Sequence, residues 1–78
     1  MINSHYDQKN DVMYISLSNP RPSYSEELDD GIYLRYDMET DEFTGITIIG
    51  FSKRIDQLKF IKMPCYIPFD EIKQKWLQ

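Results

Sequence analysis

The chain has 78 residues, of which 41% are hydrophobic and 14% aromatic, and its formal net charge is −4. These values predict a single ordered domain over residues 1–78 and exclude wholesale disorder. They also exclude a deep ligand cavity, since so short a chain buries only about 60–65% of its unfolded surface.

Cysteine content and the N-terminal residues indicate a cellular compartment. Cys65 is the only cysteine, so an internal disulfide cannot form, and we expect this side chain to be a half-buried small hydrophobe. No stretch reaches the roughly 20 apolar residues that a membrane span requires, and residues 1–5 lack an apolar signal core. We therefore expect a cytoplasmic protein without membrane contact.

Charge is distributed unevenly along the sequence. Residues 1–50 carry ten acidic and three basic side chains, whereas residues 51–78 carry six basic and three acidic ones. An acidic first part disfavours phosphate backbones and favours basic proteins or cations as partners. The alternative is that these acids only solvate turns.

A Tyr-Asp-x-x-x-Asp pattern occurs twice, at residues 6–11 and 36–41. Each copy precedes a β-rich stretch, so each predicts the turn of a β-hairpin. We expect the aspartates to accept hydrogen bonds from nearby backbone N–H groups in Asx-turns.

In chain order, the first hairpin is predicted over residues 2–18 and the second over residues 32–49. Pro20 and Pro22 predict a loop over residues 19–25, followed by an acidic exit over residues 26–30. The expected sheet, at about residues 2–51, is a four-stranded antiparallel meander.

The last part of the chain, at about residues 52–78, is predicted to be helical. Ser52 is expected to be the N-cap of a short helix in which Ile55, Leu58 and Ile61 recur at helical spacing. After a linker bracketed by Pro64 and Pro68, the residues Phe69, Ile72 and Trp76 share one face of a terminal helix. The predicted fold class is α+β, with one or two C-terminal helices covering one face of the sheet.

Alternation in the strands divides the apolar residues between two faces. The expected core face consists of Met13, Ile15, Leu17, Ile32, Leu34, Ile46 and Ile48. The opposite face is also apolar and carries Val12, Tyr14, Tyr33, Ile49 and Phe51. Either this second face is a protein-interaction surface, or the second helix wraps around the sheet to bury it.

A metal site is conceivable in the predicted fold, because a meander would bring the two acidic turns to the same end of the sheet. The acidic residues concerned are Asp7, Asp11, Asp37, Glu39, Asp41 and Glu42. The calcium-binding loop with its central glycine is absent, so we expect Asx-turns and no metal site.

Catalytic chemistry has little support in the sequence. The single histidine, His5, and the single thiol, Cys65, are sixty positions apart, and no glycine-rich phosphate loop is present. We expect no catalytic residue, no cofactor and no enzymatic activity.

A basic segment carries Lys53, Arg54, Lys59 and Lys62. These side chains would suit a nucleic-acid contact, but the acidity of the chain disfavours that partner. The alternative is the solvated face of a helix.

Three segments of the chain form a recognisable pattern: Tyr6-Asp7-x-x-x-Asp11-x-x-Tyr14-Ile15-x-Leu17, Gly31-Ile32-x-Leu34-x-Tyr36-Asp37 and Thr44-Gly45-Ile46-x-Ile48-x-x-Phe51-Ser52-Lys53-Arg54. In their order and spacing these segments resemble a family of small prokaryotic proteins known as domain of unknown function number 2283. Asp41 stands where the family pattern leads us to expect a turn glycine, and residues 60–78 lie outside the pattern. The resemblance implies no catalytic residues, and it implies an antitoxin-like partner of a basic ribonuclease toxin.

The function expected from these observations is protein–protein association without catalysis. The partner would be a second copy of the chain, as a homodimer, or a basic toxin-like protein inhibited by an acidic antitoxin-like domain. The alternatives are a nucleic-acid-binding regulator and a small cation-responsive domain.

Overall fold

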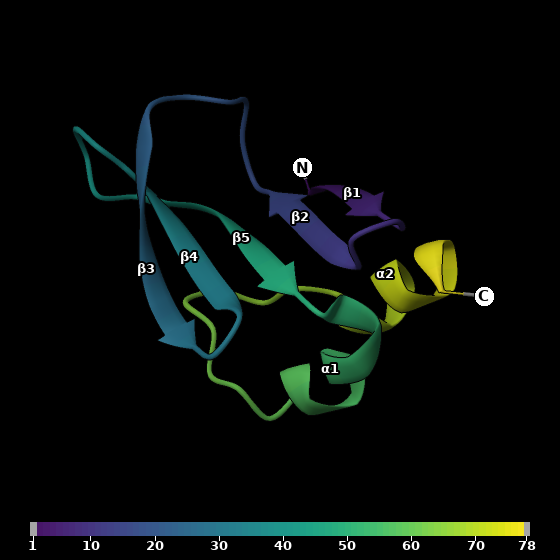
Figure 1. Cartoon of the computed structure of the whole chain (residues 1–78). Coiled ribbons are helices and arrows are strands. Elements are labelled where there is room, and N and C mark those ends of the chain that lie inside the picture. Colours follow the sequence, from purple (N-terminus) through teal and green to yellow (C-terminus); the bar gives the residue numbers. More distant parts are fainter. Residues whose placement is uncertain (1, 78) are drawn as a thin grey trace.

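The computed structural model describes residues 2–77, so the two ends of the predicted domain, residues 1 and 78, lie outside the described residues. Five strands precede two helices (Figure 1). The strands are β1 (Asn3–Asp7), β2 (Val12–Ser16), β3 (Ser23–Asp29), β4 (Ile32–Asp37) and β5 (Phe43–Ile49). The helices are α1 (Phe51–Leu58) and α2 (Phe69–Trp76).

All five strands form one antiparallel sheet in the order β1-β2-β5-β4-β3. The predicted α+β class and the two hairpins are confirmed, but the prediction of four strands in a simple meander is wrong. The chain crosses from β2 to the far edge of the sheet before it returns through β3 and β4, which places β5 against β2.

The additional strand is β3, where a loop and an acidic exit were predicted. All seven of its side chains are exposed, so the strand has no buried face and shows no apolar alternation. Pro20 and Pro22 lie just before its first residue and leave its pairing with β4 intact. Proline is compatible with a strand at this place because β3 is an edge strand.

Six of the seven residues predicted for the core face lie in the core. The exception is Leu17, which follows the last residue of β2 and is half-buried outside the core. Ile46 pairs with Ile15 on one side and Leu34 on the other, and Ile48 pairs in the same way with Met13 and Ile32. Two rows of aliphatic side chains therefore cross the three central strands, and all six are buried.

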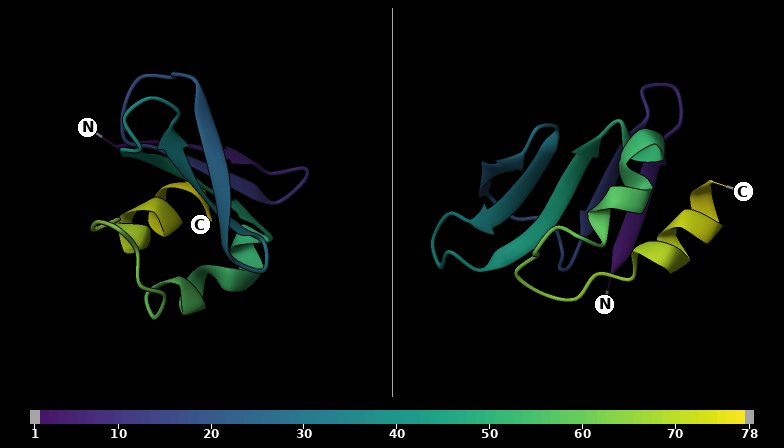
Figure 2. Two further views of the ribbon diagram at one scale, coloured as in Figure 1. Left: turned by 90° about the vertical axis from the view of Figure 1, so that its left-hand side faces the viewer. Right: turned by 90° about the horizontal axis from the view of Figure 1, so that it is seen from below.

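Both helices lie on this side of the sheet (Figure 2). Phe51, Ile55 and Leu58 of α1 join the core, as do Ile67 of the linker and Ile72 of α2. Each fully buried aliphatic side chain contributes about 1.5–3 kcal/mol relative to an exposed one. The predicted cover of one face by C-terminal helices is confirmed.

The start and end of α1 differ from the prediction. Its N-cap is Gly50, whose φ of 73° is left-handed, and Ser52 is the second helical residue. The helix ends at Leu58, so Ile61 packs on the core from the following segment. Glycine is suited to this cap because it adopts positive φ without a steric penalty.

The two helices are eight residues each, and neither has the length or the apolar composition needed to cross a membrane.

Candidate functional site

The face of the sheet opposite the helices carries no other described element (Figure 2). Register places His5, Tyr14, Thr47, Tyr33 and Glu27 in one row across all five strands on this open face. The rings of His5 and Tyr14 stack with their centroids 6.4 Å apart. The middle row of the open face therefore carries tyrosine side chains on both sides of Thr47.

The predicted interaction residues divide between this face and the core. Tyr14 and Ile49 are 41% and 46% exposed, and Val12 and Tyr33 are half-buried. Phe51 is 0% exposed, so its placement on the open face is wrong. The left-handed Gly50 turns the chain after β5, so that Phe51 begins α1 and packs against the ring of Tyr6 at a centroid distance of 5.7 Å.

Arg35 lies flat against the open face between β5 and β2. Its guanidinium donates to the hydroxyl oxygen of Thr47 at 2.6 Å, to the carbonyl of Ile15 at 2.8 Å and to the hydroxyl oxygen of Ser16 at 3.3 Å. Burial lowers the pKa of Arg35 below its usual range. Arg35 is the only basic residue of the central strands β2, β4 and β5. Because these bonds hold its charge against the sheet, the neighbouring apolar side chains are the ones that the open face presents to a partner.

Gly45 makes this arrangement sterically feasible. A Cβ atom at this position would overlap with Nη2 of Arg35 and with the carbonyl oxygen of Ile15. The glycine is thus required for the close approach of the guanidinium to the backbone of β2. Its role could not be read from the sequence, because Arg35 and Gly45 become neighbours only through strand pairing.

The two acidic turns lie at opposite ends of the sheet, so the predicted convergence of their carboxylates is wrong. Val12 pairs with Ile49 at one end, whereas the turn that follows β4 leads into Phe43 at the other end. Inserting β3 reverses the direction of the second hairpin relative to the first. No group of three or more metal-ligating side chains occurs among residues 2–77.

The Asx-turns themselves are confirmed. Asp7 accepts a hydrogen bond from the backbone N–H of Asn10, and Asp37 accepts from Glu39 and Thr40. The two backbone hydrogen bonds to Asp37 lower the pKa of its carboxyl group. The positive charge of Arg21, whose Nη1 lies 3.1 Å from Oδ2 of Asp37, lowers this pKa further.

The second acid of each repeat has a left-handed backbone, with φ of 55° at Asp11 and 62° at Asp41. Each of them also accepts a hydrogen bond from a tyrosine hydroxyl, of Tyr6 and Tyr24 respectively. The expectation of a turn glycine at position 41 agrees with this positive φ, since aspartate is among the few other residues that tolerate it.

Asp11 also caps helix α1, which sequence reasoning missed. Its carboxylate accepts the backbone N–H of Ser52 at 2.9 Å and the Ser52 hydroxyl at 2.8 Å. Burial opposes ionisation, but the hydrogen bonds from Tyr6 and Ser52 together lower the pKa of Asp11. The partners are forty-one positions apart, so only the tertiary structure brings them together.

The predicted basic segment does not form one helix face. Lys53 and Arg54 belong to α1, whereas Lys59 and Lys62 follow its last residue. Arg54 donates to the carbonyl of Ile49 at 2.8 Å and lies 3.8 Å from a carboxylate oxygen of Asp30. Its charge is therefore partly engaged within the molecule.

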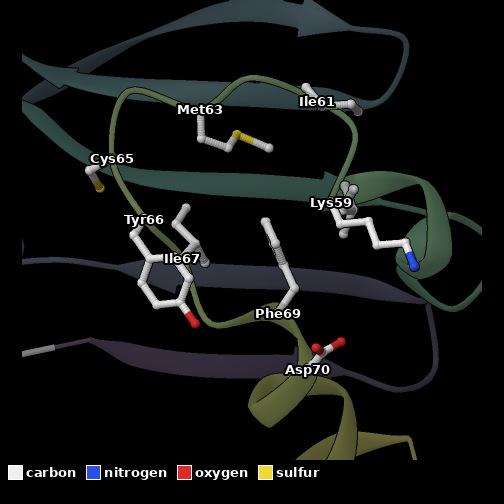
Figure 3. A pocket seen from close by; sticks show the side chains of 9 residues that line it. Lys59, Ile61, Met63, Cys65, Tyr66, Ile67, Phe69 and Asp70 are labelled. Atoms are coloured by element: carbon white, nitrogen blue, oxygen red, sulfur yellow. The ribbon is translucent and has the colours of Figure 1, made fainter.

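A hollow of about 260 Å³ lies between the end of α1 and the start of α2. Met63, Ile67 and Phe69 converge on it, whereas Lys59 points away (Figure 3). Cys65 at its margin is exposed rather than half-buried as predicted, because the linker between the prolines turns it to solvent.

Residues 3–52 match the model of a family described as protein of unknown function (DUF2283). The chain belongs to this family. The match covers the whole sheet and ends at Ser52, so it contains both partners of the Asp11–Ser52 contact and leaves the linker and α2 outside. No curated protein and no solved structure matches the chain.

Proposed function

We propose that this member of the family is a non-enzymatic protein–protein interaction domain that self-associates through the open face of its sheet. The observation that carries the proposal is the exposure of Tyr14 and Ile49, two large side chains on a face that both helices leave uncovered. Surfaces of this composition are typical of the centre of protein interfaces.

The charges of the open face favour a second copy of the same chain. A two-fold dimer sets a patch against itself, so the patch must tolerate its own charges. Here the acids Asp7 and Glu27 lie on the outer strands, and Arg35 is bonded to the sheet between them. Two such faces can meet through Tyr14, Tyr33, Val12 and Ile49, because the acids lie on the outer strands and hydrogen bonds hold the Arg35 guanidinium against its own sheet.

The size of the face indicates a weak interface. Five strands of about five residues present a flat area of about 400 Å² by standard strand spacing and rise. A stable interface buries about 800 Å² per partner, so we expect transient dimers with a dissociation constant of about 10 μM to 1 mM.

The test is sedimentation of the chain over a range of concentrations up to about 1 mM. We expect the average mass to rise from that of the 9.4 kDa monomer toward twice that value. The double variant Tyr14→Thr, Ile49→Thr should stay monomeric. The matched control is the double variant Met38→Thr, Phe60→Thr, which also removes two exposed apolar side chains. Met38 lies in the turn after β4 and Phe60 follows α1, so this variant should dimerise like the wild type. A wild type that stays monomeric, or a dimer unaffected by the first pair, would refute the proposal.

A second candidate is an acidic, antitoxin-like inhibitor of a basic protein, which the net charge of −4 favours. Co-purification of the tagged chain from its native host tests it, with a stoichiometric basic protein as the expected result. The nucleic-acid alternative has less support, because the four basic residues lie on two different segments. The cation alternative lost its support when the acidic turns were found at opposite ends of the sheet.

A further inference from the structure

Strand β3 forms one edge of the sheet, and its outer side pairs with no other strand among residues 2–77. It lies at the left margin of the sheet in Figure 1, away from α2. All seven of its side chains are exposed. Its backbone is therefore accessible to another chain along its length.

The direction of the free backbone groups follows from the pairing with β4. The N–H of Met38 donates to the carbonyl of Pro22 at 3.1 Å. Hydrogen-bonded pairs alternate in an antiparallel ladder, so Ser23, Ser25 and Glu27 direct their N–H and C=O groups outward. The pairing of β3 with β4 is regular from Ser23 to Glu27, and its register shifts between Glu27 and Asp29. The regular part offers room for about five residues of an added strand.

The charge of this edge selects the kind of partner. Glu26, Glu27, Asp29 and Asp30 are all exposed, and the side chain of Asp30, which is 95% exposed, lies 3.8 Å from the guanidinium of Arg54. A second copy of β3 would bring acids against acids, which destabilises cross-strand pairing. Opposite charges on a partner strand would instead be stabilised.

Glu26 and Glu27 are adjacent in a strand and so point to opposite faces of the sheet. Glu27 pairs with Tyr33 on the open face, and Glu26 pairs with Leu34 on the helix side. A complementary strand therefore needs two adjacent basic residues, one for each face.

We propose that the outer edge of β3 binds an extended basic segment of another protein by strand addition. The added strand bonds to the backbone of Ser23, Ser25 and Glu27, and a pair of adjacent lysine or arginine side chains lies beside Glu26 and Glu27. This site is separate from the open face and does not depend on self-association through Tyr14 and Ile49.

The experiment is an NMR titration of the isotope-labelled full chain with the blocked peptide acetyl-Thr-Val-Lys-Arg-Val-Thr-amide. We expect chemical-shift changes concentrated on β3 and slower hydrogen exchange at the amides of Ser25 and Glu27. The same peptide with glutamine in place of lysine and arginine should bind at least tenfold more weakly.

Two kinds of variant separate backbone pairing from charge. Ser25→Pro removes an outward N–H that β4 does not use, and proline is tolerated at such edge positions, so we expect a folded protein with at least tenfold weaker binding. Ser25→Ala keeps the N–H and should bind like the wild type. Glu26→Lys with Glu27→Lys should abolish binding. Asp70→Lys with Glu71→Lys changes the net charge equally on exposed positions of α2, away from β3, and should have an effect of less than twofold.

The outcomes are distinct. Equal losses in the two charge-reversed pairs would show general electrostatic attraction and overturn the proposal, as would undiminished binding by a folded Ser25→Pro variant. Shift changes on α1 instead of β3 would also overturn it. The Tyr14→Thr, Ile49→Thr variant should bind the peptide normally, so failure of this site and failure of self-association can be told apart.

Discussion

At the scale of single residues, Asp11 joins parts of the molecule that are distant in sequence. Its backbone carbonyl accepts hydrogen bonds from the N–H groups of Gly50 and Phe51 at 2.8 and 3.0 Å. Its carboxylate accepts hydrogen bonds from the backbone N–H of Ser52 and from the hydroxyl of Tyr6. An acidic side chain is favourable at a helix N-terminus, where backbone N–H groups have no partner within the helix. The first hairpin turn thus holds the start of α1 in place.

Replacing Asp11 should destabilise the folded protein, and Asp41, the equivalent residue of the second repeat, supplies the control. Asp11→Ala removes the cap of α1, the partner of Tyr6 and a residue suited to positive φ, whereas Asp41→Ala removes the partner of Tyr24 and a residue with the same φ preference. The two substitutions differ mainly in the cap, so we expect Asp11→Ala to lower the free energy of unfolding by about 1–3 kcal/mol more than Asp41→Ala. Urea unfolding measures both, and equal losses would contradict a capping role for Asp11.

At the scale of elements, sequence patterns predicted some segments well and missed others. The spacing of Phe69, Ile72 and Trp76 predicted α2 correctly, because helical periodicity is a local property. Strand β3 was missed because it buries no side chain and so carries no periodic apolar signal. The open-face residues Tyr14 and Ile49 were predicted from alternation alone, whereas Phe51 was misplaced because a left-handed glycine ends the alternation one residue earlier.

Although α2 lies outside the family match, its packing indicates that the fold depends on it. Ile72 is buried against the core, and the indole N–H of Trp76 donates to the hydroxyl oxygen of Ser4 at 2.8 Å. We expect Ile72→Ala to lower the free energy of unfolding by about 2–4 kcal/mol.

The control for this prediction is Gln74→Ala, an exposed position on the same helix, which should change stability by less than about 0.5 kcal/mol. Thermal and urea unfolding of the two variants check the difference. Equal midpoints would mean that α2 adds no packing energy to the sheet.

At the scale of the whole molecule, the titration of a few paired groups sets the pH range of stability. The pKa values of Asp11 and Asp37 are lowered in the folded state, so their contribution to stability is present above the unfolded pKa of about 3.9 and is lost as pH falls through the folded pKa. The hydrogen bond to Asp11 raises the pKa of Tyr6, and that to Asp41 raises the pKa of Tyr24 to about 12. Their contribution is present below the unfolded pKa of about 10 and is lost as pH rises above it.

We therefore expect the free energy of unfolding to be nearly constant from about pH 5 to pH 9 and to decline on both sides. Urea unfolding at a series of pH values measures the profile. The double variant Asp11→Asn, Asp37→Asn should show a shallower decline on the acid side, since neither side chain then titrates. An acid limb identical to that of the wild type would show that other carboxylates control it.

The sequence by itself determined the properties that depend on near neighbours: the two Asx-turns, the alternation that separates core from open face, the terminal helix and the membership of the family. The tertiary structure alone decided the place of β5 between β2 and β4, the strand character of Ser23–Asp29 and the contact of Asp11 with Ser52. The physical reason is that periodicity and turn chemistry act over a few residues. Strand order and capping by a distant side chain depend instead on which segments meet when the core is buried.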